Sequence, residues 1–201
     1  MKLQKFAIEK EYIYIVPSMF SMFKNLHPVV RLFGAVILLY IVWYVLYQFV
    51  LVPGGAFDFW LTRQVTSHSI WVLNLISGGF DIFVNPYGMC SILRNNLKVI
   101  SVNHACNGQL LYPVFWSFII VTRGPWLNKL IMITAGSFII YFTNLIRVVA
   151  LVYIRLNYPA YLRFNHKYTF VILVYSVIFM LWVYWAKEFS KKQILKDAQG
   201  E

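Results

Sequence analysis

Residues 126–154 read WLNKLIMITAGSFIIYFTNLIRVVALVYI, a stretch that is almost wholly apolar. A helix needs about 20 apolar residues to cross the hydrocarbon core of a bilayer, so the stretch predicts a membrane-spanning helix. Four strongly polar side chains interrupt it, those of Asn128, Lys129, Asn144 and Arg147. Because a charged side chain inside a membrane is costly, Arg147 indicates a partner, a cavity or the end of the span.

The whole chain shares this apolar character. Of its 201 residues, 60% are hydrophobic and 12% are charged, whereas soluble domains are about 45–50% apolar and about 25% charged. We therefore expect an integral membrane protein that forms a single membrane domain over residues 1–201. The net charge of +11 does not indicate nucleic-acid binding, because the basic residues lie at the chain ends and in loops between apolar segments. That distribution is typical of topology determinants and of contact with membrane lipid.

Three further apolar segments predict additional spans: 29–52, 108–121 and 168–185. A weaker segment, 69–84, contains a Gly78-Gly79 pair and Asp81. It is short and polar for a span, and could be a re-entrant segment, an interfacial segment or a tilted helix buried in protein. We therefore expect an all-α bundle of about four to six transmembrane helices within residues 29–185.

The positive-inside rule orients these segments. The basic tail, residues 186–201, is expected to be cytoplasmic, and the basic N-terminus, residues 1–28, to be cytoplasmic or interfacial. Counting back from the tail puts the loop 155–167 and the polar segment 85–107 on the outside. Within the polar segment, residues 97–102 alternate in polarity and predict a short strand.

Three chemistry-bearing residues, Cys106, Arg147 and His166, fall at the external ends of the last three predicted spans. Cys106 precedes the segment 108–121, and His166 precedes the final span. Arg147 follows Lys129 by 18 residues, or about 27 Å at 1.5 Å per residue of helix. A thiol, a guanidinium and an imidazole on one side of a membrane are typical of an active site with a cysteine nucleophile.

Cys106 lies in the sequence NHACNGQ (103–109), where the polar segment enters the predicted helix. Backbone N–H groups at a helix N-terminus, here near Asn107 and Gly108, can activate a thiol and donate hydrogen bonds to an oxyanion. The alternative is a small buried cysteine that only packs. Cys90 lies on the same external side, and a disulfide between the two cysteines in an oxidising compartment would remove the nucleophile.

The other two residues have expected roles of their own. Asn144 precedes Arg147 by three residues on one helix face, where the pair is expected to orient a carbonyl or stabilise an oxyanion. The alternative for Arg147 is a side chain that reaches along the lipid to the interface. His166 is expected to be the general base, although it could be an exposed loop histidine, and His104 is the rival base. Three residues are weaker candidates or have no assigned role: His68, His27 and Asp81.

Three motifs together resemble the exosortase/archaeosortase family of membrane enzymes: Ala105-Cys106-Asn107-Gly108, Asn144-x-x-Arg147-Val148, and His166 ahead of the final span. The likeness covers roughly residues 85–185. It implies that Cys106, Arg147 and His166 form a catalytic triad. Members of this family are thought to cut the C-terminal sorting tails of exported proteins in a sortase-like transpeptidation.

The resemblance also implies partners and a location. The substrate would be a membrane-anchored protein with a C-terminal apolar helix, and an amine or water would accept the acyl group. No metal or organic cofactor is implied. The chain would be a compact multi-pass protein of a bacterial plasma (inner) membrane, with its active site facing outside. It departs from the family pattern at Asn107, where Ser is usual, and at Lys167 and Tyr168, where an acidic residue and Gly often follow the histidine.

Two other classes of function compete with this interpretation. The first is a non-catalytic membrane scaffold or assembly factor for the export of surface proteins or polysaccharide, in which Arg147 is structural. The second is a transporter or channel subunit, which is disfavoured because the polar groups cluster at one face rather than along a path across the membrane.

Overall fold

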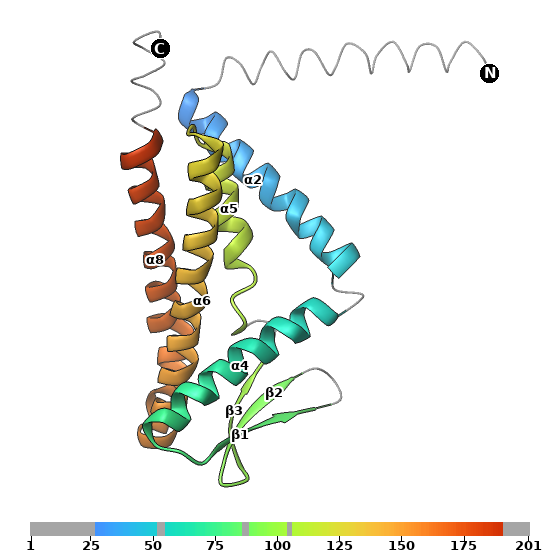
Figure 1. Ribbon diagram of the computed structural model, residues 1–201, viewed down its shortest axis with the longest axis vertical. Coiled ribbons are helices and arrows are strands. Elements are labelled where there is room, and N and C mark those ends of the chain that lie inside the picture. The colour runs from blue at the N-terminus through green and yellow to red at the C-terminus, as the bar shows by residue number, and fades with distance from the viewer. Residues whose placement is uncertain (1–26, 52–54, 86–88, 104–105, 191–201) are drawn as a thin grey trace, which may run out of the picture.

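The computed structural model describes residues 27–51, 55–85, 89–103 and 106–190. The predictions for most of the basic N-terminus (1–28), for most of the basic tail (186–201) and for His104 lie outside these residues. The described chain forms a bundle of helices with a small antiparallel sheet at one end (Figure 1).

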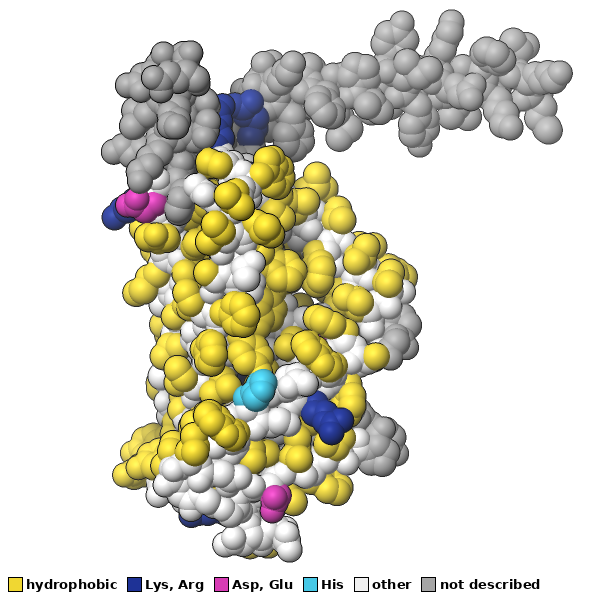
Figure 2. Space-filling view, viewed as in Figure 1, with side chains coloured by type: hydrophobic (Ala, Val, Ile, Leu, Met, Phe, Trp, Pro, Cys, Tyr) yellow, Lys and Arg dark blue, Asp and Glu magenta, His cyan; other side chains and the backbone are white. Residues whose placement is uncertain are grey.

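Three helices are long and apolar enough to cross a membrane: Val29–Leu51, Trp126–Asn157 and Pro159–Glu188. They contain helix α2 (Pro28–Leu46), helix α6 (Trp126–Asn157) and helix α8 (Phe170–Trp185). These helices correspond to three of the predicted spans, and they support the membrane class. Hydrophobic side chains cover most of the helical surface in Figure 2, where charged side chains are few.

The predicted span at 108–121 is different. Its helix, α5 (Leu111–Val121), has 11 residues, which is about 16 Å of helix and roughly half of a hydrocarbon core. Gly108 has a positive φ of 81° and therefore lies outside the helix. The segment does not form a helix long enough to cross by itself, and the total of four to six spans stays a prediction.

The segment 69–84 does not form one unit, because Gly78 and Gly79 break it with φ values of 67° and 76°. Helix α4 (Ala56–Ile76) precedes the break, and strand β1 (Phe80–Val84) follows it. The Asn74 side chain clamps the junction, accepting from the Phe80 N–H and donating to the Phe80 carbonyl at 2.9 Å each. Helix α4 lies obliquely across the end of α6 (Figure 1).

The sheet contains three antiparallel strands in the order β1-β2-β3. Strand β2 (Cys90–Arg94) and strand β3 (Leu97–Val102) are joined by Asn95 and Asn96, both with positive φ, as a two-residue hairpin turn requires. The strand predicted at 97–102 is confirmed as β3. The all-α prediction is wrong for this part of the chain, because the alternation of a short half-buried strand is a weak signal and β1 and β2 were not recognised.

Two apolar clusters hold the molecule together. One joins α4, the sheet and α6, and the other joins α5, α6 and α8. Helices α5 and α6 approach closely where Gly136 faces the Phe115 ring, so closely that a Cβ on residue 136 would overlap the ring. Small residues permit such contacts between apolar helices. At the far end of the bundle, the Trp185 indole donates to the Thr122 hydroxyl at 2.7 Å.

Candidate active site

Cys106 lies in the loop between β3 and α5, five residues before the helix begins at Leu111. The prediction that it lies at a helix N-terminus is therefore wrong. The Asn107 side chain accepts a hydrogen bond from the Gln109 N–H at 2.9 Å, a local turn that competes with helix formation. The Gly108 backbone, in its left-handed conformation, then redirects the chain into α5.

The Cys106 thiol and the His166 imidazole lie side by side, with 3.6 Å between Sγ and Nε2. The two residues are 60 positions apart in the chain. His166 lies in the wide helical turn Asn165–Thr169, which leads into α8. The thiol is partly exposed, and the imidazole is exposed at the mouth of the site. This distance is within reach for proton transfer between a sulfur nucleophile and its base.

Arg147 approaches the same site from α6. Its Nε atom is buried and has no hydrogen-bond partner, and its charge is close enough to act on His166 electrostatically. The side chain lines a cavity of about 210 Å³, together with Gly108 and Leu111 on one side and Phe170 and Val174 on the other. A guanidinium that borders a cavity beside a thiol can donate hydrogen bonds to an anion formed there.

Asn144 holds the Cys106 loop against α6. Its side chain is 1% exposed, and its Nδ2 donates a 2.9 Å hydrogen bond to the Cys106 carbonyl. A Cβ on residue 108 would stand 3.3 Å from the Asn144 Cγ, so Gly108 allows the loop to lie against α6. The predicted grouping of Asn144 with the triad agrees with this geometry. Its hydrogen bond goes to the Cys106 carbonyl, which makes it a positioning residue for the loop; the expected roles were to orient a carbonyl or to stabilise an oxyanion.

Asn107 anchors the other side of the loop, through a network that the sequence analysis missed. Its buried Nδ2 donates to the Asp58 carboxylate and to the Thr62 hydroxyl, both at 3.3 Å. The Tyr47 hydroxyl donates to the other oxygen of Asp58. Asp58 lies in the first turn of α4, and an isolated carboxylate in a chain with only seven acidic residues was the available signal. We assigned no role to Asp81, which is exposed on β1, and we overlooked Asp58.

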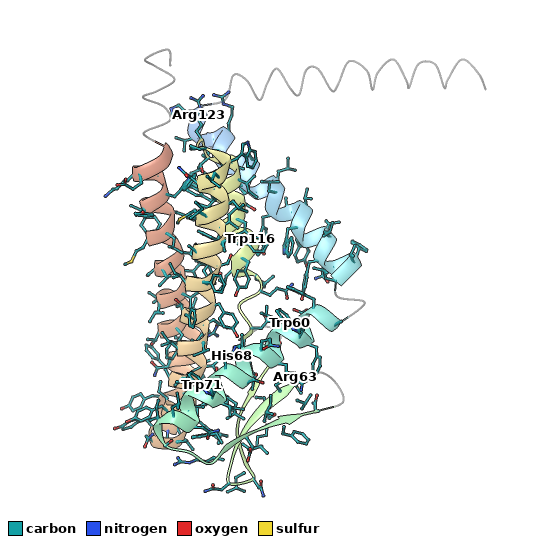
Figure 3. All side chains as sticks on the ribbon, viewed as in Figure 1. Trp60, Arg63, His68, Trp71, Trp116 and Arg123 are labelled. Atoms are coloured by element: carbon teal, nitrogen blue, oxygen red, sulfur yellow. The ribbon has the colours of Figure 1, made fainter. Side chains whose placement is uncertain are left out.

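The remaining candidate histidines have other partners. The His68 Nδ1 lies 2.6 Å from the Tyr141 hydroxyl. It borders a separate groove of about 550 Å³ between α4, α5 and α6, on the face shown in Figure 3. The His27 ring accepts from the Val29 N–H at 3.4 Å, as the cap of α2.

Both cysteines are free, so the conceivable disulfide is absent from the structure. Cys90 is fully buried in β2, and burial raises the pKa of its thiol. Cys106 is the more accessible of the two. Within the part of the chain that the structure describes, no group of three His, Cys, Asp or Glu side chains could hold a metal ion.

A comparison of the chain with protein-family models, with curated proteins and with solved structures finds no match.

Proposed function

We propose that the protein is a membrane-embedded cysteine peptidase or transpeptidase, an exosortase-like enzyme that cleaves the C-terminal sorting tails of exported proteins. The observation that carries this proposal is the 3.6 Å separation of the Cys106 Sγ and the His166 Nε2. The thiol and the imidazole come from two different elements and supply the nucleophile and the base that acyl transfer through a thioester needs. Arg147 lines the cavity beside Gly108, two residues from Cys106, and would supply the oxyanion donor.

The reaction begins with proton transfer from Cys106 to His166. The thiolate attacks a backbone carbonyl of the client tail, and the carbonyl oxygen becomes an oxyanion to which the Arg147 guanidinium donates. When the tetrahedral intermediate collapses, the C–N bond breaks, and His166 returns the proton to the leaving amine. The acyl group stays on Cys106 as a thioester. Water or the amine of an acceptor then attacks the thioester, which releases the product and restores the thiol.

In this proposal the membrane fixes which peptide bond of the client reaches Cys106. Arg147 lies on an apolar helix 18 residues beyond Lys129, at about the thickness of a hydrocarbon core from the other boundary. A client held by its own apolar helix presents the residues beside that helix at a fixed depth. A nucleophile at the bilayer boundary therefore meets the same peptide bond in every client. We propose that this boundary is the outer face of a bacterial plasma membrane.

The test uses a secreted protein that ends in an apolar helix and a basic tip, co-produced with the wild-type chain, with Cys106→Ala or with Cys90→Ala. We expect intact-mass measurements to show loss of the tail with wild type and with Cys90→Ala, and a full-length client with Cys106→Ala. Cys90 is the matched control because it is the other cysteine of the chain and its thiol is free but buried.

The mass of the new C-terminus distinguishes hydrolysis from transfer to an amine. Equal processing by wild type and Cys106→Ala would eliminate Cys106 as the nucleophile. If several tailed proteins stay uncut while Cys106→Ala preserves export, the scaffold alternative replaces the peptidase.

A further inference from the structure

A second cavity lies at the end of α6, away from the thiol. It has a volume of about 490 Å³, and its wall contains Arg94, Asn95 and Lys98 of the β2–β3 hairpin and Arg155 and Pro159 at the end of α6. The two parts of the wall are more than 50 residues apart in the sequence. The folded chain therefore brings cationic side chains from two elements to one concave surface.

These cations have no acidic counterpart. The lining of the cavity contains two arginines and one lysine, and it contains no Asp or Glu. The closest acid in the sheet, Asp81, lies on β1 and is separated from Lys98 on β3 by the intervening strand β2. Like charges gathered around a cavity repel one another, and a bound anion relieves that repulsion.

Two of the cations are held in place by the fold. The Arg94 guanidinium carbon lies 5.2 Å from the centroid of the buried Phe80 ring, a cation–π contact that restrains the group. Arg155 lies in the last turn of α6, where the negative end of the helix dipole favours a cation. A planar guanidinium that is held in advance suits the oxygens of a phosphate.

The position of the cavity along α6 indicates which kind of molecule carries the anion. Arg155 lies eight residues beyond Arg147 on the uninterrupted α6 helix, which is about 12 Å further from the hydrocarbon core. Exposed tyrosines surround this level, at 153, 158 and 161, and tyrosine gathers at membrane–water interfaces. Lipid phosphates occupy the zone just outside the hydrocarbon, and the exposed tyrosines indicate that the cavity borders this zone.

We propose that this cavity binds the phosphate of an anionic lipid headgroup. Arg94 supplies paired donors to the phosphate oxygens, and Lys98 and Arg155 supply the remaining charge. The bound lipid would join the sheet to the end of α6. This site is separate from the thiol, and its occupancy does not depend on the peptidase proposal.

The test is native mass spectrometry of the purified full chain in neutral detergent, titrated with phosphatidylglycerol, with phosphatidylcholine or with inorganic phosphate. We expect phosphatidylglycerol to bind at least tenfold more tightly than phosphatidylcholine, and more tightly than inorganic phosphate. Lys98→Gln combined with Arg155→Gln should remove this preference. Arg63→Gln combined with Lys187→Gln is the charge-matched control, because both side chains are exposed away from the cavity, and it should retain the preference.

A conservative pair keeps the result interpretable if the neutral variant unfolds. Lys98→Arg combined with Arg155→Lys preserves the charge and should retain at least half of the wild-type preference. Equal affinity for the two lipids would overturn the proposal, as would the same loss in the control pair. Binding of inorganic phosphate as tightly as phosphatidylglycerol would overturn the lipid assignment, because the site would then take a free anion.

Discussion

The side-chain amide of Asn144 donates a 2.9 Å hydrogen bond to the backbone carbonyl of Cys106. This bond ties the Cys106 loop to α6 one turn away from Arg147. The thiol and the guanidinium are therefore both positioned by α6. On its other side the loop is tied to α4 through Asn107. The position of the Cys106 loop therefore depends on two asparagines, Asn107 and Asn144.

Replacement of Asn144 by Ala should impair tail cleavage more than it impairs folding. Loss of one hydrogen bond costs about 1 kcal/mol of stability, whereas a loop free to move by about 1 Å can lower the rate by about 100-fold. Thermal unfolding in detergent and client processing measure the two effects. Thr143→Ala is the control, since its hydroxyl bonds only within its own helix. A cleavage loss no larger in Asn144→Ala than in Thr143→Ala would contradict the positioning role.

Replacement of Asn107 by Ala should destabilise the protein by about 1–3 kcal/mol. The change leaves the Gln109 N–H without its side-chain acceptor and removes one of the two donors to the Asp58 carboxylate, which keeps the Tyr47 hydroxyl, and unsatisfied buried polar groups cost this much. Scanning fluorimetry should show a lower melting temperature than for Asn157→Ala, an exposed asparagine that bonds within α6. Asn107→Ser keeps a hydroxyl acceptor and should fall between the two. A variant as stable as wild type would show that the network contributes nothing.

The thiol of Cys106 should react with iodoacetamide faster when His166 is present. In a Cys90→Ala background only one cysteine remains, so the alkylation rate followed by mass spectrometry reports Cys106 alone. Because the imidazole lies 3.6 Å from the sulfur and can accept its proton, His166→Gln should lower the rate several-fold at pH 7. His68→Gln should leave it unchanged, since His68 bonds to Tyr141. Equal alkylation rates in His166→Gln and His68→Gln would show that His166 does not activate the Cys106 thiol.

Cys90 should resist alkylation in the folded protein. Burial raises the pKa of its thiol above the ordinary 9.0, so the thiol keeps its proton at pH values where the thiol of an unfolded chain ionises. The folded state therefore loses stability relative to the unfolded state as the pH rises through 9.0. At pH 8 we expect one labelled cysteine in the native chain and two after denaturation. The fall in melting temperature between pH 8 and pH 10 should be smaller in Cys90→Ala, and an equal fall would contradict this account.

A side chain at residue 136 should separate α5 from α6. A Cβ there overlaps the Phe115 ring, and overpacking of a filled core costs about 1–3 kcal/mol. Gly136→Ala should therefore lower the melting temperature, and Phe115→Leu in the same chain should recover part of the loss. Ala135→Ser, at an exposed neighbouring position, is the control. Additive effects of the two core changes would show that residues 136 and 115 do not share this contact.

The apolar segments were the part of the fold that the sequence predicted best. Residues 126–154 and 168–185 correspond to α6 and to the helix that contains α8, because the length and apolarity of a span are local properties of the chain. The strand at 97–102 was also recognised, from its alternation. The sequence left the segment 69–84 open between a re-entrant segment, an interfacial segment and a tilted buried helix. Two glycines divide it between a helix and a strand, and hydropathy does not register backbone conformation.

The sequence by itself predicted a membrane protein and singled out Cys106, Arg147 and His166 as candidate reactive groups, because residue type and the length of apolar segments are local properties of the chain. Only the tertiary structure decided that a thiol and an imidazole 60 residues apart approach to 3.6 Å, and that Asp58 and Asn144 hold the intervening loop. Contacts between distant segments depend on how helices pack and where loops turn. Those relations arise from the shape of the folded chain, and no local pattern carries them.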